Sequence, residues 1–275
     1  MIDQTKVKQS IKLIQALNRS DQQYCVAFSG GKDSVVVLDL AKKAGVPFVA
    51  QYSNTTIDPP GTMSFIRHNY PEVEILQPAR SFYKLVELKG LPTRVGRFCC
   101  EHLKERAGIG MRTIDGTRWD ESVARSYYTP EDCDSRKWMR GAVHIRPILN
   151  WTTRDIWDYI HEYRLPYIKY YDAPFYFKRH GCIGCPHAGS HGQIEEFKLF
   201  PRHARALLIA IAKNRTTKPN NVFARKFNDE YEVFHWWLSG LKINDWLEKE
   251  KNQIFRPDYK QLIEEAIFNA NKIRE

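Results

Sequence analysis

The chain has 275 residues, of which 43% are hydrophobic and 27% are charged, and its 42 basic and 32 acidic side chains give a net charge of +10. This composition excludes a disordered, collagen-like or disulfide-scaffold protein. The longest aliphatic run, at residues 206–212, is too short to cross a bilayer, and the N-terminus lacks the apolar segment of a signal peptide. A cytoplasmic protein with no membrane partner is therefore expected. The positive charge favours phosphate-bearing ligands, either nucleotides or nucleic acid.

The first two thirds of the chain alternate predicted strands with predicted helices. An amphipathic helix at 5–19 precedes an apolar strand at 24–28, and a glycine-rich loop then leads into a helix at 35–44 and a second strand at 46–52. A strand, a crossover helix and a second strand of this kind form a parallel βαβ unit. The alternation continues with helices at 62–70, 82–89 and 152–163 and with strands at 73–76, 111–115 and 143–148.

From residue 193 the pattern is helical, and the predicted helices are 193–213, 226–239, 242–250 and 258–273. We therefore expect two parts. Residues 1–190 form an α/β domain built on a doubly wound, mostly parallel sheet. Residues 191–275 form a helical C-terminal extension.

A glycine-rich loop, Ser-Gly-Gly-Lys-Asp-Ser at residues 29–34, lies where the first strand meets its helix. Open parallel sheets bind ligands at that position. Gly30 and Gly31 allow successive backbone N–H groups to face one concavity, to which the helix adds its positive end and Lys32 adds a full charge. The two serines that bound the loop add hydroxyl donors. The loop is therefore expected to bind a pyrophosphate group. Because it lacks the Walker spacing, a kinase or motor ATPase is not implied.

This loop resembles the PP-loop of the ATP pyrophosphatase superfamily, whose adenine nucleotide alpha hydrolase-like members split ATP between the α and β phosphates. Four further segments resemble the phosphoadenosine phosphosulfate (PAPS) reductase family of that superfamily, namely 54–60, 116–125, 146–159 and 165–185. The match runs in order from about residue 20 to residue 187. The resemblance implies that superfamily's α/β fold and a site for ATP with Mg²⁺, formed by Ser29, Gly30, Gly31, Lys32, Asp33, Ser34, Asn54, Gly116, Arg118 and Arg125.

The same resemblance implies catalytic roles for Lys32, Asp33 and Arg118. Arg118 and Arg125 would clamp phosphate or sulfate oxygens, because a guanidinium group offers an oxyanion two parallel N–H donors. The residue types alone also allow a structural role, since such arginines form ion pairs on the surface or in the core.

Four of the six cysteines form two close pairs, Cys99-Cys100 and Cys182-x-x-Cys185. Four thiolates suit either zinc or an iron–sulfur cluster. Structural zinc usually takes two Cys-x-x-Cys pairs, whereas each thiolate of a cuboidal cluster binds a different iron, which accommodates adjacent cysteines more easily. The same arrangement occurs in iron–sulfur members of the PAPS reductase family, so a [4Fe-4S] cluster is expected, with zinc and unligated thiols as alternatives. Cys133 lies in an acidic loop, which disfavours a reactive thiolate.

The chain departs from the sulfonucleotide reductases at their nucleophile. Those enzymes use a cysteine in a Glu-Cys-Gly-x-His type motif, and no cysteine follows Cys185 here. The PP-loop lysine also suits the use of ATP itself. The resemblance is therefore nearest to the DndC-like sulfurtransferase branch and implies an AMP- and pyrophosphate-forming iron–sulfur sulfurtransferase. A reductase that acts on adenosine 5′-phosphosulfate (APS) or PAPS, and a non-catalytic nucleotide-binding subunit, remain alternatives.

The expected partners are ATP or an adenylyl sulfate nucleotide, a sulfur donor such as a cysteine desulfurase, and DNA or RNA as the acceptor. Support for a nucleic acid comes from a basic stretch that also contains Phe223, because cations interleaved with an aromatic ring suit a phosphate backbone. The alternative for this stretch is a solvated basic loop. Its cations are Arg202, Arg205, Lys213, Arg215, Lys218, Arg225 and Lys226.

Overall fold

A computed structural model describes residues 1–19, 22–253 and 255–269, and the chain divides into two compact units. Unit 1 consists of Met1–Asn54, Pro60–Pro78 and Glu101–Gly181, and unit 2 consists of Thr55–Pro59, Ala79–Cys100 and Cys182–Glu275. The sequence predicted a single division near residue 190, whereas the two units interleave along the chain. Each unit is described separately.

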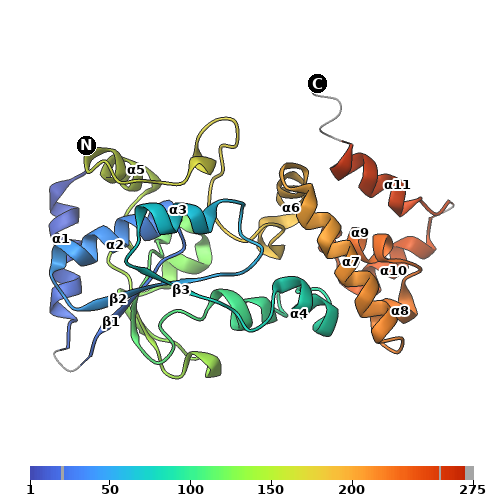
Figure 1. The fold of residues 1–275 in the computed structure, drawn as a ribbon, viewed down its shortest axis with the longest axis horizontal. Coiled ribbons are helices and arrows are strands. Elements are labelled where there is room, and N and C mark those ends of the chain that lie inside the picture. The colour runs from blue at the N-terminus through green and yellow to red at the C-terminus, as the bar shows by residue number, and fades with distance from the viewer. Residues whose placement is uncertain (20–21, 254, 270–275) are drawn as a thin grey trace. The chain divides into compact units, whose positions relative to one another are not determined.

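Unit 1 is built on a six-stranded sheet with the order β3-β2-β1-β4-β6-β5. Figure 1 labels three of these strands, β1, β2 and β3. The first five strands in this order are parallel, and β5 pairs antiparallel with β6 at the edge. This topology confirms the predicted doubly wound, mostly parallel α/β fold. The strands are β1 (Tyr24–Ala27), β2 (Phe48–Ser53), β3 (Val73–Leu76), β4 (Arg112–Ile114), β5 (Glu131–Cys133) and β6 (Val143–Ile145).

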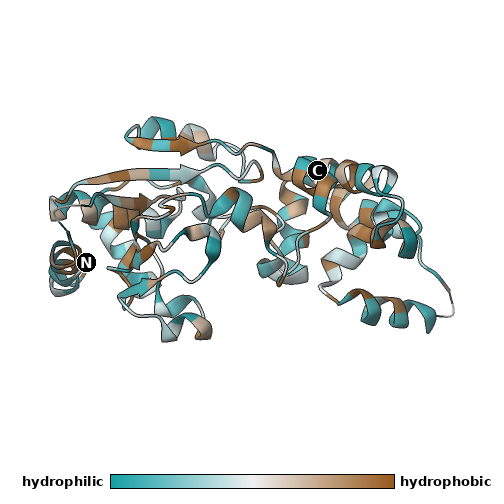
Figure 2. Ribbon diagram, turned by 90° about the horizontal axis from the view of Figure 1, so that it is seen from below, coloured by the Kyte–Doolittle hydropathy of each residue, from teal (hydrophilic) through white to brown (hydrophobic). Residues whose placement is uncertain are grey.

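The central helix of unit 1 is α2 (Lys32–Ala44), which packs against β1 and against the flanking helices α1 and α5. Because α2 has neighbours on two sides, its apolar residues are buried. Hydrophobic residues also recur along the strands and the other helices (Figure 2). Gly45, in the left-handed conformation, ends the helix. The other helices of unit 1 are α1 (Gln4–Ala16), α3 (Thr62–Asn69) and α5 (Thr153–Glu162).

The edge strand β5 lies in a segment that the sequence analysis interpreted as an acidic loop. Its three residues, Glu131–Cys133, are all exposed, so they show no alternation of apolar and polar residues that would predict a strand. An edge strand needs only one hydrogen-bonded neighbour, and β6 supplies it. Pairing with β6, rather than burial, therefore defines this strand.

Unit 2 is helical. The sequence predicted one helix at 193–213, but the structure has two, because Phe200 is not helical and Pro201, which lacks an N–H group, begins the second. The final predicted helix, at 258–273, is found only in part, and residues 270–273 lie outside the described residues. The helices are α4 (Phe82–Lys89), α6 (Gly189–Leu199), α7 (Pro201–Thr217), α8 (Val222–Lys226), α9 (Glu230–Ser239), α10 (Ile243–Lys251) and α11 (Tyr259–Ile263), with a π-helix at Glu264–Phe268.

Residues 79–100 belong to the helical unit because of packing rather than sequence order. Helix α4 packs along α7, and the indole N–H of Trp237 donates to the Pro92 carbonyl oxygen at 2.6 Å. These contacts give α4 its hydrophobic neighbours. Across the described part of the chain, no helix is both long and apolar enough to cross a membrane.

A charged network joins the carboxyl end of β4 to β6. In His144, Nδ1 lies 2.8 Å from Asp115 Oδ2, and Nε2 lies 2.9 Å from Asp134 Oδ2. Burial disfavours the charged imidazole, but the hydrogen bonds and charges of the two aspartates outweigh burial and raise the pKa of His144. Burial likewise opposes ionisation of the carboxyls, yet His144 lowers the pKa of Asp115, and Arg136 with His144 lowers that of Asp134. Asp115 also accepts the Thr117 N–H, so the network reaches the segment after β4.

The substitution His144→Gln should lower the free energy of unfolding by about 1–3 kcal/mol near pH ~6, because two carboxylates lose a charged hydrogen-bond partner. The raised pKa of His144 stabilises the fold fully below the unfolded value of about 6.5, and this contribution is lost as the pH rises through the folded value. The lowered aspartate pKa values act in the opposite sense, and their contribution is lost as the pH falls below about 4. Urea unfolding of both proteins from pH ~6 to pH ~9 should show the difference shrinking, and a constant difference would contradict the network.

Candidate functional site

The loop at residues 29–34 lies where the order of the strands reverses. Strands β2 and β3 lie on one side of β1, and β4 and β6 lie on the other, so the carboxyl end of β1 is the topological switch point of the sheet. Gly30 turns the chain there with a φ of +75°, and Gly31 is the residue before α2. The hydroxyl oxygens of Ser29 and Ser34 are 3.2 Å apart, and the Ser34 hydroxyl donates to the Gly31 carbonyl oxygen at 2.8 Å. The bend therefore has a defined shape.

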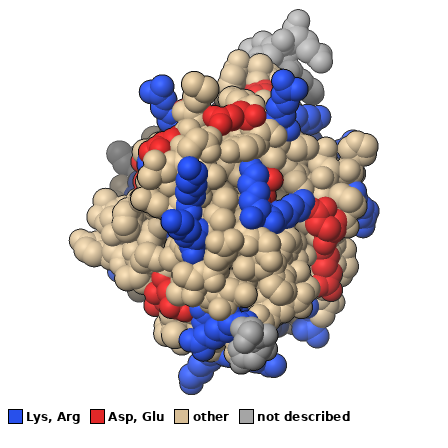
Figure 3. Space-filling view, turned by 90° about the vertical axis from the view of Figure 1, so that its left-hand side faces the viewer, with Lys and Arg blue, Asp and Glu red and all other residues tan. Residues whose placement is uncertain are grey.

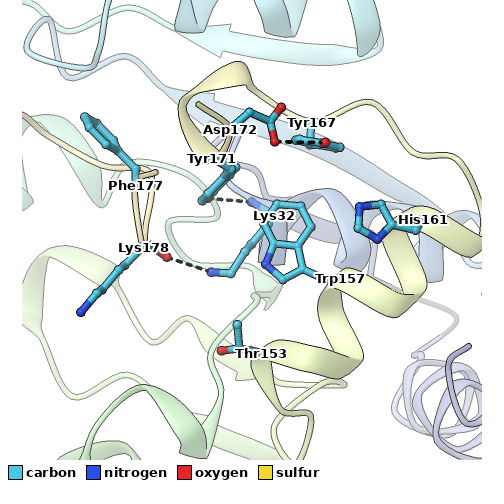
Figure 4. A pocket seen from close by; sticks show the side chains of 9 residues that line it. All are labelled: Lys32, Thr153, Trp157, His161, Tyr167, Tyr171, Asp172, Phe177 and Lys178. Atoms are coloured by element: carbon cyan, nitrogen blue, oxygen red, sulfur yellow. Dashed lines mark hydrogen bonds between the residues drawn. The ribbon is translucent and has the colours of Figure 1, made fainter. Parts of the chain in front are cut away.

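Lys32 is the first residue of α2, and it is only 4% exposed. Its Nζ lies 2.9 Å from Asp33 Oδ2 and 3.4 Å from the Lys178 carbonyl oxygen (Figure 4). Its backbone N–H donates to the Tyr171 hydroxyl at 3.0 Å, and the same hydroxyl accepts the His180 N–H. Burial raises the pKa of Tyr171 to about 12, so this acceptor stays uncharged at neutral pH. The first turn of α2 thus carries a buried cation in a fixed position.

Arg118 follows β4 and reaches the same loop. The residue is 2% exposed, and its Nε donates to Asp33 Oδ1 at 2.7 Å. One terminal nitrogen also donates to the Trp151 carbonyl oxygen at 3.3 Å and to Asp120 Oδ2 at 3.2 Å. Asp33 therefore has Lys32 paired with one oxygen and Arg118 paired with the other. The structure brings these three predicted residues together, and we call them the Asp33 ion-pair group.

Gly116 and Asn54 follow the strands that flank β1. A Cβ atom on Gly116 would lie 3.0 Å from the carbonyl carbon of Asp33, so any other residue would force the two segments apart by a few tenths of an ångström. The Asn54 amide nitrogen donates to Gln77 Oε1 at 2.8 Å. Both residues lie at the edge of the sheet where parallel strands end and ligands bind. The role of Asn54 and Gly116 in binding a nucleotide stays a prediction.

Arg125 lies further out, with a side chain that is 37% exposed and paired with Glu121. Burial lowers its pKa, and the positive charge of Arg179 lowers it further. Asp33 is among the charges that act on Arg125 in the opposite direction. Two guanidinium groups therefore lie near each other and within electrostatic reach of the loop.

A cavity of about 450 Å³ opens beside Lys32 (Figure 4). The rings of Trp157 and His161, both on α5, stack with 5.7 Å between their centroids, and Trp157 meets Tyr171 edge to face at 5.2 Å. Among the residues that line this cavity, the sequence predicts a functional role only for Lys32. The i, i+4 pair of rings on one face of α5 is the signal that could have revealed the cavity. The other lining residues are Thr153, Tyr167, Asp172, Phe177 and Lys178.

Aromatic walls suit a planar ring, and the lysine at one end suits a negatively charged group attached to that ring. The cavity therefore has the chemical character of a nucleotide site. Its position beside the first turn of α2 adds the positive end of that helix.

The basic stretch between residues 202 and 226 is largely used inside unit 2. Arg215 donates to three backbone carbonyl groups between residues 223 and 228. Lys213 and Lys218 donate to acceptors on α4. These cations fix helices to one another, so the stretch offers a nucleic acid fewer cations than its sequence suggests.

The four paired cysteines lie together in unit 2. The Cys99 thiol is hydrogen-bonded to Cys100, and Cys182 and Cys185 lie close enough for their charges to act on it. The hydrogen bond to Cys100, burial and these negative charges all raise the pKa of Cys99. All four residues are partly buried. The structure thus brings two distant parts of the sequence to one place, and their role as ligands of a metal or cluster stays a prediction.

The turn between the last two cysteines is held from several sides. Gly184 has a φ of +67°, which favours glycine, and its N–H donates to Glu196 Oε2 at 2.6 Å. Its carbonyl oxygen accepts the Gln193 amide at 2.9 Å. The Arg94 Nε donates to the Pro186 carbonyl oxygen at 3.1 Å, which ties the segment before the first cysteine pair to this turn.

Four gathered thiols fit a zinc ion or an iron–sulfur cluster in their chemistry. Because ionised sulfurs raise the pKa of Cys99, ionisation of all four needs a compensating cation. Within residues 1–19, 22–253 and 255–269, no group of three or more His, Cys, Asp or Glu side chains is arranged to hold a metal ion. The donors are therefore close together but do not form a closed coordination site.

Comparison with known proteins gives matches over the sheet-containing part of the chain. Residues 23–188 match the phosphoadenosine phosphosulfate reductase domain. An uncharacterized protein of Methanocaldococcus jannaschii is 31% identical over 185 residues, which cover 64% of this chain and 44% of that protein. Adenosine 5′-phosphosulfate reductase 2 of Bacillus subtilis is 27% identical over 171 residues, which cover 58% of this chain and 70% of that protein. The chain spans less than half the length of the first curated relatives that it matches.

Among solved structures, the U34-tRNA thiolase NcsA from Methanococcus maripaludis, described with its [4Fe-4S] cluster, gives a TM-score of 0.40. The identity is 14%, and the superposition covers 84% of this chain and 86% of that chain.

The substitution Gly116→Ala should weaken ATP binding by about tenfold or more, because the new methyl group pushes the segment after β4 away from Asp33 and misplaces the loop. Isothermal titration with ATP measures the effect. Gly96→Ala is the matched control, since its Cβ would approach only the flexible Thr93 hydroxyl, at 3.3 Å. Unchanged ATP affinity in Gly116→Ala would show that the close approach to Asp33 does not shape a nucleotide site.

Proposed function

The chain belongs to the phosphoadenosine phosphosulfate (PAPS) reductase domain family, and from this premise we propose that it is an ATP-dependent sulfurtransferase that forms AMP and pyrophosphate. Its relatives include enzymes named as APS and PAPS reductases. One observation carries the proposal: the buried Asp33 ion-pair group lies at the carboxyl end of β1, beside a glycine bend and an aromatic-lined cavity.

In this proposal the phosphates of ATP lie on the backbone amides of residues 29–34. The positive end of α2 and the Lys32 ammonium group favour negative charge there. Asn54, Gly116 and Arg125 surround the phosphates, and the cavity beside Lys32 gives a planar ring aromatic walls. A Mg²⁺ ion would be held mainly by phosphate oxygens, because both oxygens of Asp33 are already paired with cations.

Adenylylation of an acceptor oxygen is the proposed first step. The acceptor oxygen attacks the α-phosphorus, the bond from that phosphorus to the α–β bridging oxygen breaks, and pyrophosphate leaves with the electron pair. Lys32 stabilises the charge that develops on the departing pyrophosphate. Asp33 orients Lys32 and Arg118, so it acts on the reaction through its two partners. When bound, Mg²⁺ would neutralise further phosphate charge.

Sulfur transfer is the proposed second step. A sulfur nucleophile at the oxidation level of sulfide attacks the acceptor atom that bears the adenylylated oxygen, which is the phosphorus of a phosphate or the carbon of a carbonyl group. The bond from that atom to the oxygen breaks, and AMP leaves with the former acceptor oxygen. The acceptor then carries sulfur in place of oxygen. The proposed acceptor is a phosphate of DNA or a base carbonyl of RNA. The proposed sulfur source is a persulfide on a donor such as a cysteine desulfurase, and a dithiol reductant releases its outer sulfur as sulfide while the dithiol is oxidised to a disulfide.

We assign Cys99, Cys100, Cys182 and Cys185 as the ligands of a [4Fe-4S] cluster, with zinc as the alternative. Support comes from the four thiols that unit 2 gathers, and from adjacent cysteines, which suit separate irons better than a single zinc ion. When bound, the cluster would supply iron as a binding position for sulfur.

A second candidate function is reduction of APS or PAPS, which the named relatives favour. The same loop and cavity would then hold an adenylyl sulfate nucleotide. Sulfite release from APS in the presence of thioredoxin distinguishes this activity from the first. A nucleotide-binding subunit without activity would bind ATP and release no product.

The substitution Lys32→Gln should lower the rate of pyrophosphate release from ATP by about 100-fold or more, because the departing pyrophosphate loses a positioned cation. A coupled pyrophosphate assay with the full chain and an oligonucleotide acceptor measures the rate. Lys12→Gln, on the exposed side of α1, is the control and should keep the wild-type rate. Equal rates in Lys32→Gln and the wild type would exclude this role for Lys32.

The anaerobically purified protein should contain about four irons and four sulfides per chain, with visible absorbance that dithionite bleaches. The double substitution Cys182→Ser, Cys185→Ser should lose the iron and the absorbance. Cys133→Ser, which changes an exposed cysteine outside this group, should keep both. One zinc per chain in place of iron would replace the cluster assignment with the zinc alternative.

A further inference from the structure

Net charge alone does not locate a nucleic-acid interface on this protein. On the face shown in Figure 3, lysine and arginine side chains alternate with acidic and uncharged ones. The basic stretch of unit 2 is also largely committed to internal hydrogen bonds. A nucleic-acid surface therefore has to be recognised by more than its charge, and unit 1 has a segment with the required chemistry.

Three aromatic side chains are exposed on the segment that follows β4. Trp119 is 42% exposed, Tyr127 is 81% exposed and Tyr128 is 40% exposed. The Trp119 indole N–H donates to the Tyr128 carbonyl oxygen at 2.9 Å, which ties the two ends of the segment together. Two short 3-10 helices, Trp119–Glu121 and Val123–Tyr127, pack against each other between these ends. An ordered segment that leaves three large rings in water is typical of an interaction surface.

Guanidinium groups accompany these rings. Arg125 lies on the same segment and is paired with Glu121, and Arg179 is near enough for its positive charge to act on Arg125. The segment begins at Arg118, whose Nε donates to Asp33, so it borders the Asp33 ion-pair group, and the side chain of Arg179 is exposed. The guanidinium carbon of Arg146 lies 4.6 Å from the centroid of the Tyr128 ring and holds that ring in place.

We propose that this part of unit 1 binds single-stranded nucleic acid and delivers an unpaired nucleotide to the loop at residues 29–34, through an aromatic–arginine surface formed by Trp119, Tyr127, Tyr128, Arg125 and Arg179. The inference rests on the proposed function for the identity of the acceptor. Exposed rings stack on any base, and guanidinium groups pair with phosphates. The large hydrophobic side chains that the segment exposes are three rings and one valine, which suits stacking better than an aliphatic protein interface.

Fluorescence anisotropy with a labelled oligouridylate, in the absence of ATP, tests the surface directly. Tyr127→Ala should weaken binding by about tenfold, because one stacking platform is lost. Tyr127→Trp should restore it. Phe255→Ala is the matched control, since Phe255 is 86% exposed in unit 2, and it should bind as the wild type does. Arg179→Gln should lower the slope of log affinity against log salt by about 0.7.

The inference is overturned if the wild type binds no single strand, if it binds a duplex of the same length as tightly, or if Tyr127→Ala keeps full affinity. Isothermal titration of ATP into Tyr127→Ala should give the wild-type affinity, which confirms that the variant is folded. If the protein binds the oligonucleotide but releases no pyrophosphate from ATP, the result counts against the proposed function and still supports this surface as a binding site for single strands.

Discussion

The functional part of unit 1 depends on the two ion pairs that the carboxylate of Asp33 forms. Lys32 and Arg118 are both almost fully buried, and each pairs with a different oxygen of this side chain. Removing one partner from a buried ion pair typically costs about 3–5 kcal/mol, because the remaining charge stays desolvated. Asp33 therefore couples the first turn of α2 to the segment after β4. The bend at residues 29–34 lies directly before this turn, and Gly116 lies against the backbone of Asp33.

The sequence contained most of the information that specifies the fold. Apolar strands and amphipathic helices alternate clearly enough to predict the parallel sheet, because each of these elements buries a recognisable face. The exceptions have local causes. The exposed strand β5 has no buried face to detect, and the break between α6 and α7 depends on Pro201. The interleaving of the two units depends on the packing of α4 along α7, which connects segments far apart in the sequence.

The candidate site was predictable where chemistry and spacing coincide. Glycines, a lysine and the strand–helix junction indicate the loop, and the spacing of the cysteine pairs indicates that their thiols meet. The aromatic cavity was not predicted, because Trp157, His161 and Tyr171 look like ordinary core residues until α5 is placed beside the loop. The basic stretch was misleading for a related reason. Charges adjacent in sequence, such as Lys213 and Arg215, point to different acceptors in the folded chain.

In the proposed function, the loop at residues 29–34 holds the phosphates of ATP. A crystal structure with the α,β-methylene analogue of ATP and Mg²⁺ tests it most directly, because the analogue cannot be cleaved between its α and β phosphates. We expect electron density for the triphosphate against the backbone amides of Gly30, Gly31 and Lys32, with the Lys32 ammonium group beside it. A triphosphate bound elsewhere, with this bend still closed by its own hydrogen bonds, would contradict the account.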